Sequence, residues 1–144
     1  MGTFTSSRTF DGAPKEVLGV LTDLEAARRW SPIPFELEGE TDSQLRTGSH
    51  ARLRGRLGGR QVRLELEILR ADCEALDLQA SGPIEIEAHY RAVPEDGRTR
   101  LMASVTVRAA RGLVSRLLSG AADALLAAGA LDQTVRSVAR EVAA

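Results

Sequence analysis

The sequence predicts an α+β fold in which a curved, seven-stranded antiparallel sheet wraps around a long C-terminal helix, with two short helices after the first strand. One observation is an apolar stripe at helical spacing between Arg111 and Val142. Another is a series of alternating segments between Phe35 and Val107, separated by turn residues. The chain has 144 residues, the size of one ordinary domain, so we expect a single domain over residues 1–144.

The first strand and the two short helices are predicted at the N-terminus. Residues 3–10 alternate and are rich in β-formers, which indicates a strand. Pro14 suits a first helical turn, and a helix is expected from there to about Leu24. A second short helix is expected from Glu25 to Trp30, because Pro32 and Pro34 prevent its continuation.

Six further strands are expected between Phe35 and Val107. The second is expected over residues 35–40, with a turn around 42–48. Gly58-Gly59 predicts a tight hairpin, and a second hairpin loop is expected at Pro94-Glu95-Asp96-Gly97.

The last helix is expected to be continuous over residues 111–142, with its apolar stripe against the sheet. The middle of this stripe is rich in alanine, and only 3% of the chain is aromatic, so bulk is missing where the helix should cross a curved sheet. A cavity is therefore expected, with an ordinary filled core as the alternative. The expected ligand-binding residues are Phe10, Trp30, Phe35, Leu37, Leu53, Leu66, Leu78, Ile86, Tyr90, Leu101, Leu117, Ala121, Leu125 and Ala128. Trp30 either gates this cavity or packs under the helix pair.

Composition and motifs exclude several classes of function. The formal net charge of −1 favours neither nucleic acid nor an anionic membrane as a partner, and no apolar run is long enough to span a bilayer. Arginines between residues 46 and 63 are expected to form ion pairs on the outer face rather than a nucleic-acid or anion site. His50 and His89 have no partners at metal-ligand spacing, and Cys73 is the single cysteine, so we expect no metal, no cofactor and no disulfide. A cytoplasmic location and a monomeric state are the expectations.

Two segments carry a resemblance to a known family. Arg8-Thr9-Phe10-Asp11-Gly12-Ala13-Pro14-Lys15-Glu16-Val17 and Leu24-Glu25-Ala26-Ala27-Arg28-Arg29-Trp30-Ser31-Pro32 resemble the START-like (SRPBCC) helix-grip superfamily, which includes polyketide cyclases/dehydrases, lipid-transfer START domains and Bet v 1-type proteins. The resemblance implies a deep apolar cavity between the sheet and the terminal helix, to which some members add polar catalytic residues.

The polar groups expected on the inner face are Arg8, Tyr90, Ser6 and Thr99, with Asp132 at its edge. Family cyclases are thought to use arginine and tyrosine side chains, so the resemblance suggests Tyr90 and Arg8 as catalytic candidates. The alternative is that Arg8 reaches the rim and Tyr90 is a core ring.

Three functions remain open from the sequence. The first is a module that binds a hydrophobic small molecule of lipid, polyketide or isoprenoid type. The second is a polyketide cyclase/dehydrase-like enzyme that uses Tyr90 and Arg8. The third is a protein-interaction module with a filled core.

Overall fold

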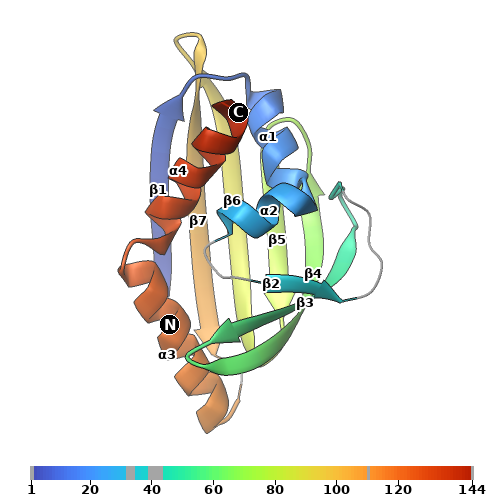
Figure 1. Ribbon diagram of the computed structural model, residues 1–144, viewed down its shortest axis with the longest axis vertical. Helices are drawn as coiled ribbons and strands as arrows, with labels where there is room; N and C mark the ends of the chain where they lie inside the picture. The colour runs from blue at the N-terminus through green and yellow to red at the C-terminus, as the bar shows by residue number, and fades with distance from the viewer. Residues whose placement is uncertain (1, 32–34, 39–43, 110, 144) are drawn as a thin grey trace.

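A computed structural model describes residues 2–31, 35–38, 44–109 and 111–143, and it confirms the predicted helix-grip architecture. In Figure 1 a curved antiparallel sheet holds the helices on its concave face. The strand order is β1-β7-β6-β5-β4-β3-β2, so the first and last strands of the chain are neighbours. The strands are β1 (Gly2–Phe10), β2 (Phe35–Glu38), β3 (His50–Leu57), β4 (Arg60–Ala71), β5 (Ala75–Ser81), β6 (Ile84–Glu95) and β7 (Arg98–Ala109). The predicted end of the second strand, and part of the turn that follows it, lie outside the described residues.

Two tight turns set the register of the sheet. Gly58 and Gly59 have φ values of 57° and 77°, and Leu57 pairs with Arg60 as predicted. The second hairpin loop is shorter than the predicted four residues, because Pro94 and Glu95 still belong to β6. Its turn is Asp96-Gly97, with φ values of 50° and 76°, which is the backbone that an Asp-Gly pair favours in a two-residue hairpin loop.

The two short helices follow β1 as expected. Helix α1 (Pro14–Thr22) has its proline in the first turn, and α2 (Leu24–Trp30) begins after Asp23, whose carboxylate accepts a hydrogen bond of 3.0 Å from the Glu25 amide. The first helix therefore ends two residues before the predicted position. Both helices pack their leucines on the concave face of the sheet.

The expectation of one continuous C-terminal helix is wrong. The segment forms α3 (Leu113–Ala127) and α4 (Ala130–Ala143), which meet at an angle of 59°. Gly129 has a φ of 98°, a left-handed conformation that glycine adopts without strain and that ends helices. None of the described helices is long and apolar enough to cross a membrane by itself, although the bent pair α3 and α4 meets the criterion of length and composition when the two are taken together.

The core lies between the concave face of the sheet and the helices α1, α2 and α4. Helix α4 buries Leu131, Val135 and Val138 and contacts β1, α1 and α2. A bidentate ion pair also joins it to α2, with Arg29 Nε and Nη2 donating to the two carboxylate oxygens of Glu141 at 2.9 and 3.1 Å. Helix α3 lies further along the sheet, towards the β3–β4 hairpin (Figure 1).

Candidate functional site

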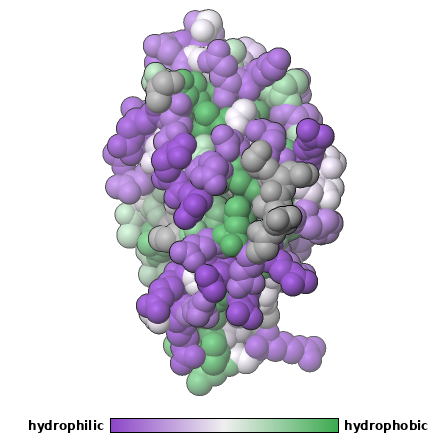
Figure 2. Space-filling model, turned by 45° about the vertical axis from the view of Figure 1, so that its right-hand side comes forward, coloured by the Kyte–Doolittle hydropathy of each residue, from purple (hydrophilic) through white to green (hydrophobic). Residues whose placement is uncertain are grey.

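An apolar cavity of about 130 Å³ lies between the concave face of the sheet and helices α1 and α2. Strands β2 to β7 supply most of its wall, and the cavity is partly open to the surface. Figure 2 shows apolar surface in the middle of one face of the molecule, next to atoms drawn in grey. Tyr90 carries the one ionisable side chain among the described residues that line the cavity. Such a space suits an apolar guest with few polar groups.

Half of the expected ligand-binding residues line this cavity. They come from α2, β2, β3, β4, β5 and β6, and they are Trp30, Phe35, Leu53, Leu66, Leu78, Ile86 and Tyr90. Phe10 and Leu101 are instead buried in the core away from the cavity, and Leu37 is half-buried on β2. The period-two alternation placed these residues on the inner face correctly, but the inner face is larger than the cavity.

The expected roof of the cavity is wrong. Leu117 is 57% exposed and Leu125 is 37% exposed, while Ala128 is exposed and Ala121 half-buried. The inner face of α3 is made by other residues, and of these only Leu126 reaches the cavity in the described part of the chain. The reason is that α3 is apolar on nearly all sides, so the spacing of its leucines does not determine which side packs.

The residues that sequence reasoning missed include inward residues of the strands, such as Val62 and Ala88, and residues outside the sheet. Leu21 and Leu24 project from the two short helices, and Leu45 follows the second strand. The Leu45 amide donates a hydrogen bond of 2.7 Å to the Thr22 carbonyl, which holds this segment against α1. The apolar face of the first helix was the available signal, because Leu21 and Leu24 belong to it.

Tyr90 and Trp30 pack against each other in the cavity wall, which also contains Phe35. Their ring centroids are 5.8 Å apart in an edge-to-face arrangement. Trp30 is buried under the helix pair, where its Nε1 donates a hydrogen bond of 3.2 Å to the Val20 carbonyl, so it is a packed ring rather than a mobile gate. Burial raises the pKa of the Tyr90 hydroxyl, which therefore stays protonated and can donate a hydrogen bond to a guest.

The structure does not bring Arg8 to Tyr90. Arg8 is exposed on the edge strand β1, two strands from Tyr90, and it is not among the cavity residues. The other expected polar groups are also engaged elsewhere. Ser6 Oγ donates to Asp132 Oδ1 at 2.5 Å, and the fully buried Thr99 donates to the Gly12 carbonyl at 2.6 Å.

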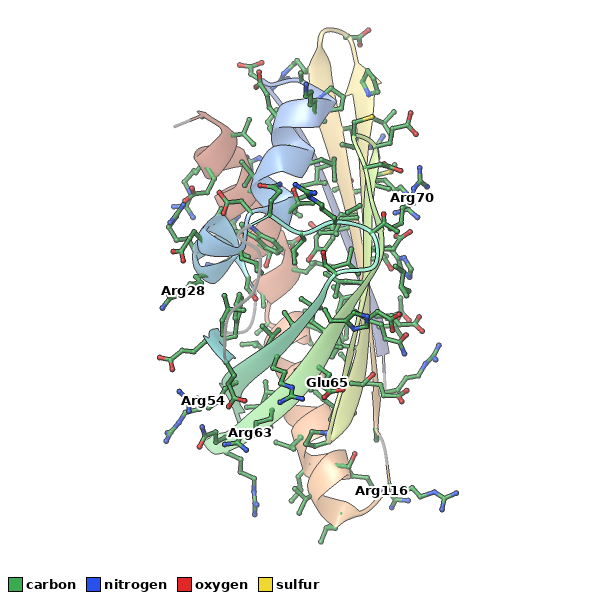
Figure 3. The ribbon with its side chains drawn as sticks, turned by 90° about the vertical axis from the view of Figure 1, so that its right-hand side faces the viewer. Arg28, Arg54, Arg63, Glu65, Arg70 and Arg116 are labelled. Atoms are coloured by element: carbon green, nitrogen blue, oxygen red, sulfur yellow. The ribbon has the colours of Figure 1, made fainter. Side chains whose placement is uncertain are left out.

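The outer face of the sheet carries ion pairs, as predicted for part of the arginine-rich segment. Arg54 lies 3.0 Å from Glu36, and Arg63 lies 3.1 Å from Glu38. Arg52 is at 3.8 Å from its partner Glu65. Figure 3 labels Arg54, Arg63 and Glu65 among the side chains on these strands.

A second charged group on this face contains His89, Asp77 and Arg91. His89 Nδ1 lies 2.7 Å from Asp77 Oδ1, and Arg91 contacts both oxygens of Asp77 at 2.6 and 3.1 Å. Burial alone would raise the pKa of Asp77, but the hydrogen bonds and charges of Arg91 and His89 outweigh burial and lower it. No group of three or more histidine, cysteine, aspartate or glutamate residues in the described ranges is arranged to hold a metal ion.

Comparisons with known proteins agree with the geometry of the fold. The family model described as polyketide cyclase / dehydrase and lipid transport matches residues 1–143. The crystal structure of TTHA0849 from Thermus thermophilus is similar with a TM-score of 0.69 and 19% identity, covering 98% of this chain and 97% of that one. The crystal structure of Ara h 8.0201 is similar with a TM-score of 0.64 and 14% identity, again covering 98% and 97%. Mll3558 from Rhizobium loti gives a TM-score of 0.64 and 20% identity, with coverages of 94% and 96%. No curated protein sequence matches the chain at a significant level.

Proposed function

Because the chain belongs to the polyketide cyclase/dehydrase and lipid transport family, within the START-like superfamily, we propose that it binds a hydrophobic small molecule in the cavity between sheet and helices. The observation that carries the proposal is a cavity of about 130 Å³ whose described lining is apolar except for Ser31 and the Tyr90 hydroxyl. We propose the whole chain, residues 1–144, as one binding domain.

The size of the cavity indicates which guests fit. An engineered protein cavity of about 150 Å³ lined by aliphatic and aromatic side chains stays dry and binds benzene. A cavity of about 130 Å³ therefore takes a single ring or a short alkyl chain. A longer lipid, polyketide or isoprenoid would extend through the open side, so that only its end lies between Trp30 and the sheet.

The chemistry of the wall favours binding over catalysis. A buried, neutral tyrosine hydroxyl can orient a carbonyl or hydroxyl group of the guest by one hydrogen bond. Stabilising an enolate would need a second polar group at the same point, and Arg8 lies outside the cavity. The cavity also argues against an interaction module with a filled core.

Trp30 provides a direct test, because it is the one tryptophan in the sequence and it lines the cavity. We would titrate the protein with toluene and with acetophenone, which adds a carbonyl group, and follow the tryptophan emission and the thermal unfolding midpoint. Binding should shift the emission in a saturable way and raise the midpoint.

Native mass spectrometry of gently purified protein gives an independent readout. A co-purifying apolar mass that is lost after unfolding and refolding would support the proposal. Absence of such a mass, together with no response to either probe, would contradict it.

A further inference from the structure

The outer face of α3 exposes a row of large apolar side chains. Leu113 is 73% exposed, Val114 46%, Leu117 57% and Leu125 37%, and we call these four residues the α3 strip. The α3 strip lies on the side of the helix away from the sheet and contributes nothing to the cavity. Large side chains exposed in one row are typical of a surface that docks on something else.

The orientation of α3 is fixed by its opposite face. Leu118, Ala122 and Leu126 are buried, and the buried Ser115 hydroxyl donates a hydrogen bond to the Pro83 carbonyl. Helix α3 has apolar residues on both its inner and its outer face. Rotating the helix about its own axis would bury one apolar face and expose the other, so apolar side chains would still be exposed to solvent. An apolar row along this helix, which has 15 residues and is about 22 Å long, therefore stays in contact with solvent.

Arginines lie on both sides of the α3 strip. Arg111 lies just before α3, and Arg116 lies near the start of this helix. Figure 3 shows Arg116 projecting from the helix into solvent. Arg56 and Arg60 flank the Gly58-Gly59 turn. This turn packs against α3, since a side-chain carbon added at Gly58 would lie 3.2 Å from Ala121 Cβ.

These arginines differ from those on the outer face of the sheet. For Arg56, Arg60, Arg111 and Arg116, the described residues provide no ion pair, although all four side chains are exposed. The one acid of α3, Asp123, has its Oδ1 buried next to Gly2 of β1 rather than facing the strip. The surface around the apolar row is therefore positively charged, although the net charge of the chain is −1.

We propose that α3 docks on an anionic lipid surface, with the α3 strip in the interface between headgroups and acyl chains and the four arginines against lipid phosphates. A helix that lies in this interface combines an apolar face with basic flanks, which is the combination that α3 and the β3–β4 turn provide together. A second copy of the chain is a poorer occupant. A symmetric dimer through the strip would bring the arginines of both copies together.

This inference uses different residues from the proposed ligand site, so the two can fail separately. The experiment is flotation of the full chain with vesicles of phosphatidylcholine alone and with vesicles of phosphatidylcholine mixed with phosphatidylglycerol. We expect binding to the mixed vesicles, weak or no binding to the neutral vesicles, and a decrease in binding as salt is added.

Two variants test the two parts of the surface. The double variant Leu113→Gln/Leu117→Gln should weaken binding to mixed vesicles by about tenfold or more, because two exposed leucines no longer enter the interface. Leu69→Gln is the matched control, because Leu69 is 47% exposed on β4 and lies outside the α3 strip. Circular dichroism and thermal unfolding should be unchanged in both.

The arginines are tested by Arg60→Gln/Arg116→Gln. We expect binding to fall by about twenty-five-fold, because each charge near the surface contributes about fivefold. Arg28→Gln removes the same charge from α2, which Figure 3 places away from Arg116, and it should leave vesicle binding unchanged.

The possible results decide the proposal. No binding to mixed vesicles, equal binding to both kinds of vesicle, or unchanged binding by the leucine variant would overturn it. Sedimentation velocity supplies the remaining outcome. A dimer that the leucine variant dissociates, without vesicle binding, would assign the strip to a second copy instead.

Discussion

Filling the cavity by Ala88→Leu tests whether the space beside Tyr90 is available. Ala88 lies on β6 with 4% exposure and lines the cavity. At about 24 cal/mol per Å³, an empty cavity of about 130 Å³ costs about 3 kcal/mol of folding stability. The three carbons that leucine adds recover at most about 2.4 kcal/mol, and imperfect fit reduces this. We therefore expect the free energy of unfolding to rise by about 1–2 kcal/mol.

The assay is urea unfolding followed by Trp30 emission, after bound molecules have been removed by unfolding and refolding. Ala103→Leu is the matched control, because Ala103 is 3% exposed on the neighbouring strand β7 but does not line the cavity. That control should lose about 1–3 kcal/mol through overpacking. Ala88→Leu should also weaken toluene binding by about tenfold. If Ala88→Leu lost as much stability as Ala103→Leu, the reasoning about the cavity would be refuted.

Three further predictions concern single residues. Tyr90→Phe should keep its affinity for toluene and lose about fivefold for acetophenone, measured by Trp30 emission, because the hydroxyl that donates a hydrogen bond to the carbonyl is removed. An equal loss for both probes would contradict this. Gly129→Ala should lower the free energy of unfolding by about 1 kcal/mol, because Gly129 has a left-handed φ of 98°. Gly120→Ala within α3 should instead raise the free energy of unfolding by about 0.5–1 kcal/mol. Similar effects at the two sites in urea unfolding would be inconsistent with the helix break. Asp77→Asn should lower the free energy of unfolding by about 1 kcal/mol at neutral pH. Because the pKa of Asp77 is lowered in the folded state, the stabilisation by its carboxylate is lost as the pH falls below about 4. The urea midpoints of wild type and variant should converge at that pH, and a constant difference would argue against the role of Arg91.

The sheet could be predicted from the sequence because local chemistry and alternation agree. Gly58-Gly59 requires a tight turn, and the turn then places Leu53 opposite Leu64 and Gly55 opposite Val62. Half of the candidate lining followed from the same alternation, since inward residues such as Leu66 and Ile86 face the cavity. Alternation determines the face of a strand but not the place of the strand in the sheet. Arg8 illustrates this limit, because it belongs to the inward-facing row of residues on β1 but β1 is the edge strand of the sheet.

The C-terminal helices could not be predicted to the same depth. Gly129 interrupts an apolar pattern that continues from Leu118 to Val138, so the pattern hides the break. In α3 the helical period supports two different apolar faces, one with Leu117 and Leu125 and one with Leu118 and Leu126. Only contacts with the sheet distinguish the two faces, and these contacts depend on the angle at which α3 leaves β7.

The pairing of β1 with β7 has a consequence for how the chain is made. Residues 2–10 find their partners in residues 99–107, so β1 cannot pair until β7 has been synthesised. Until then β1 has no neighbour, and folding cannot finish progressively from the N-terminus. Completion of this sheet therefore requires the closure of a long loop, which is expected to slow folding.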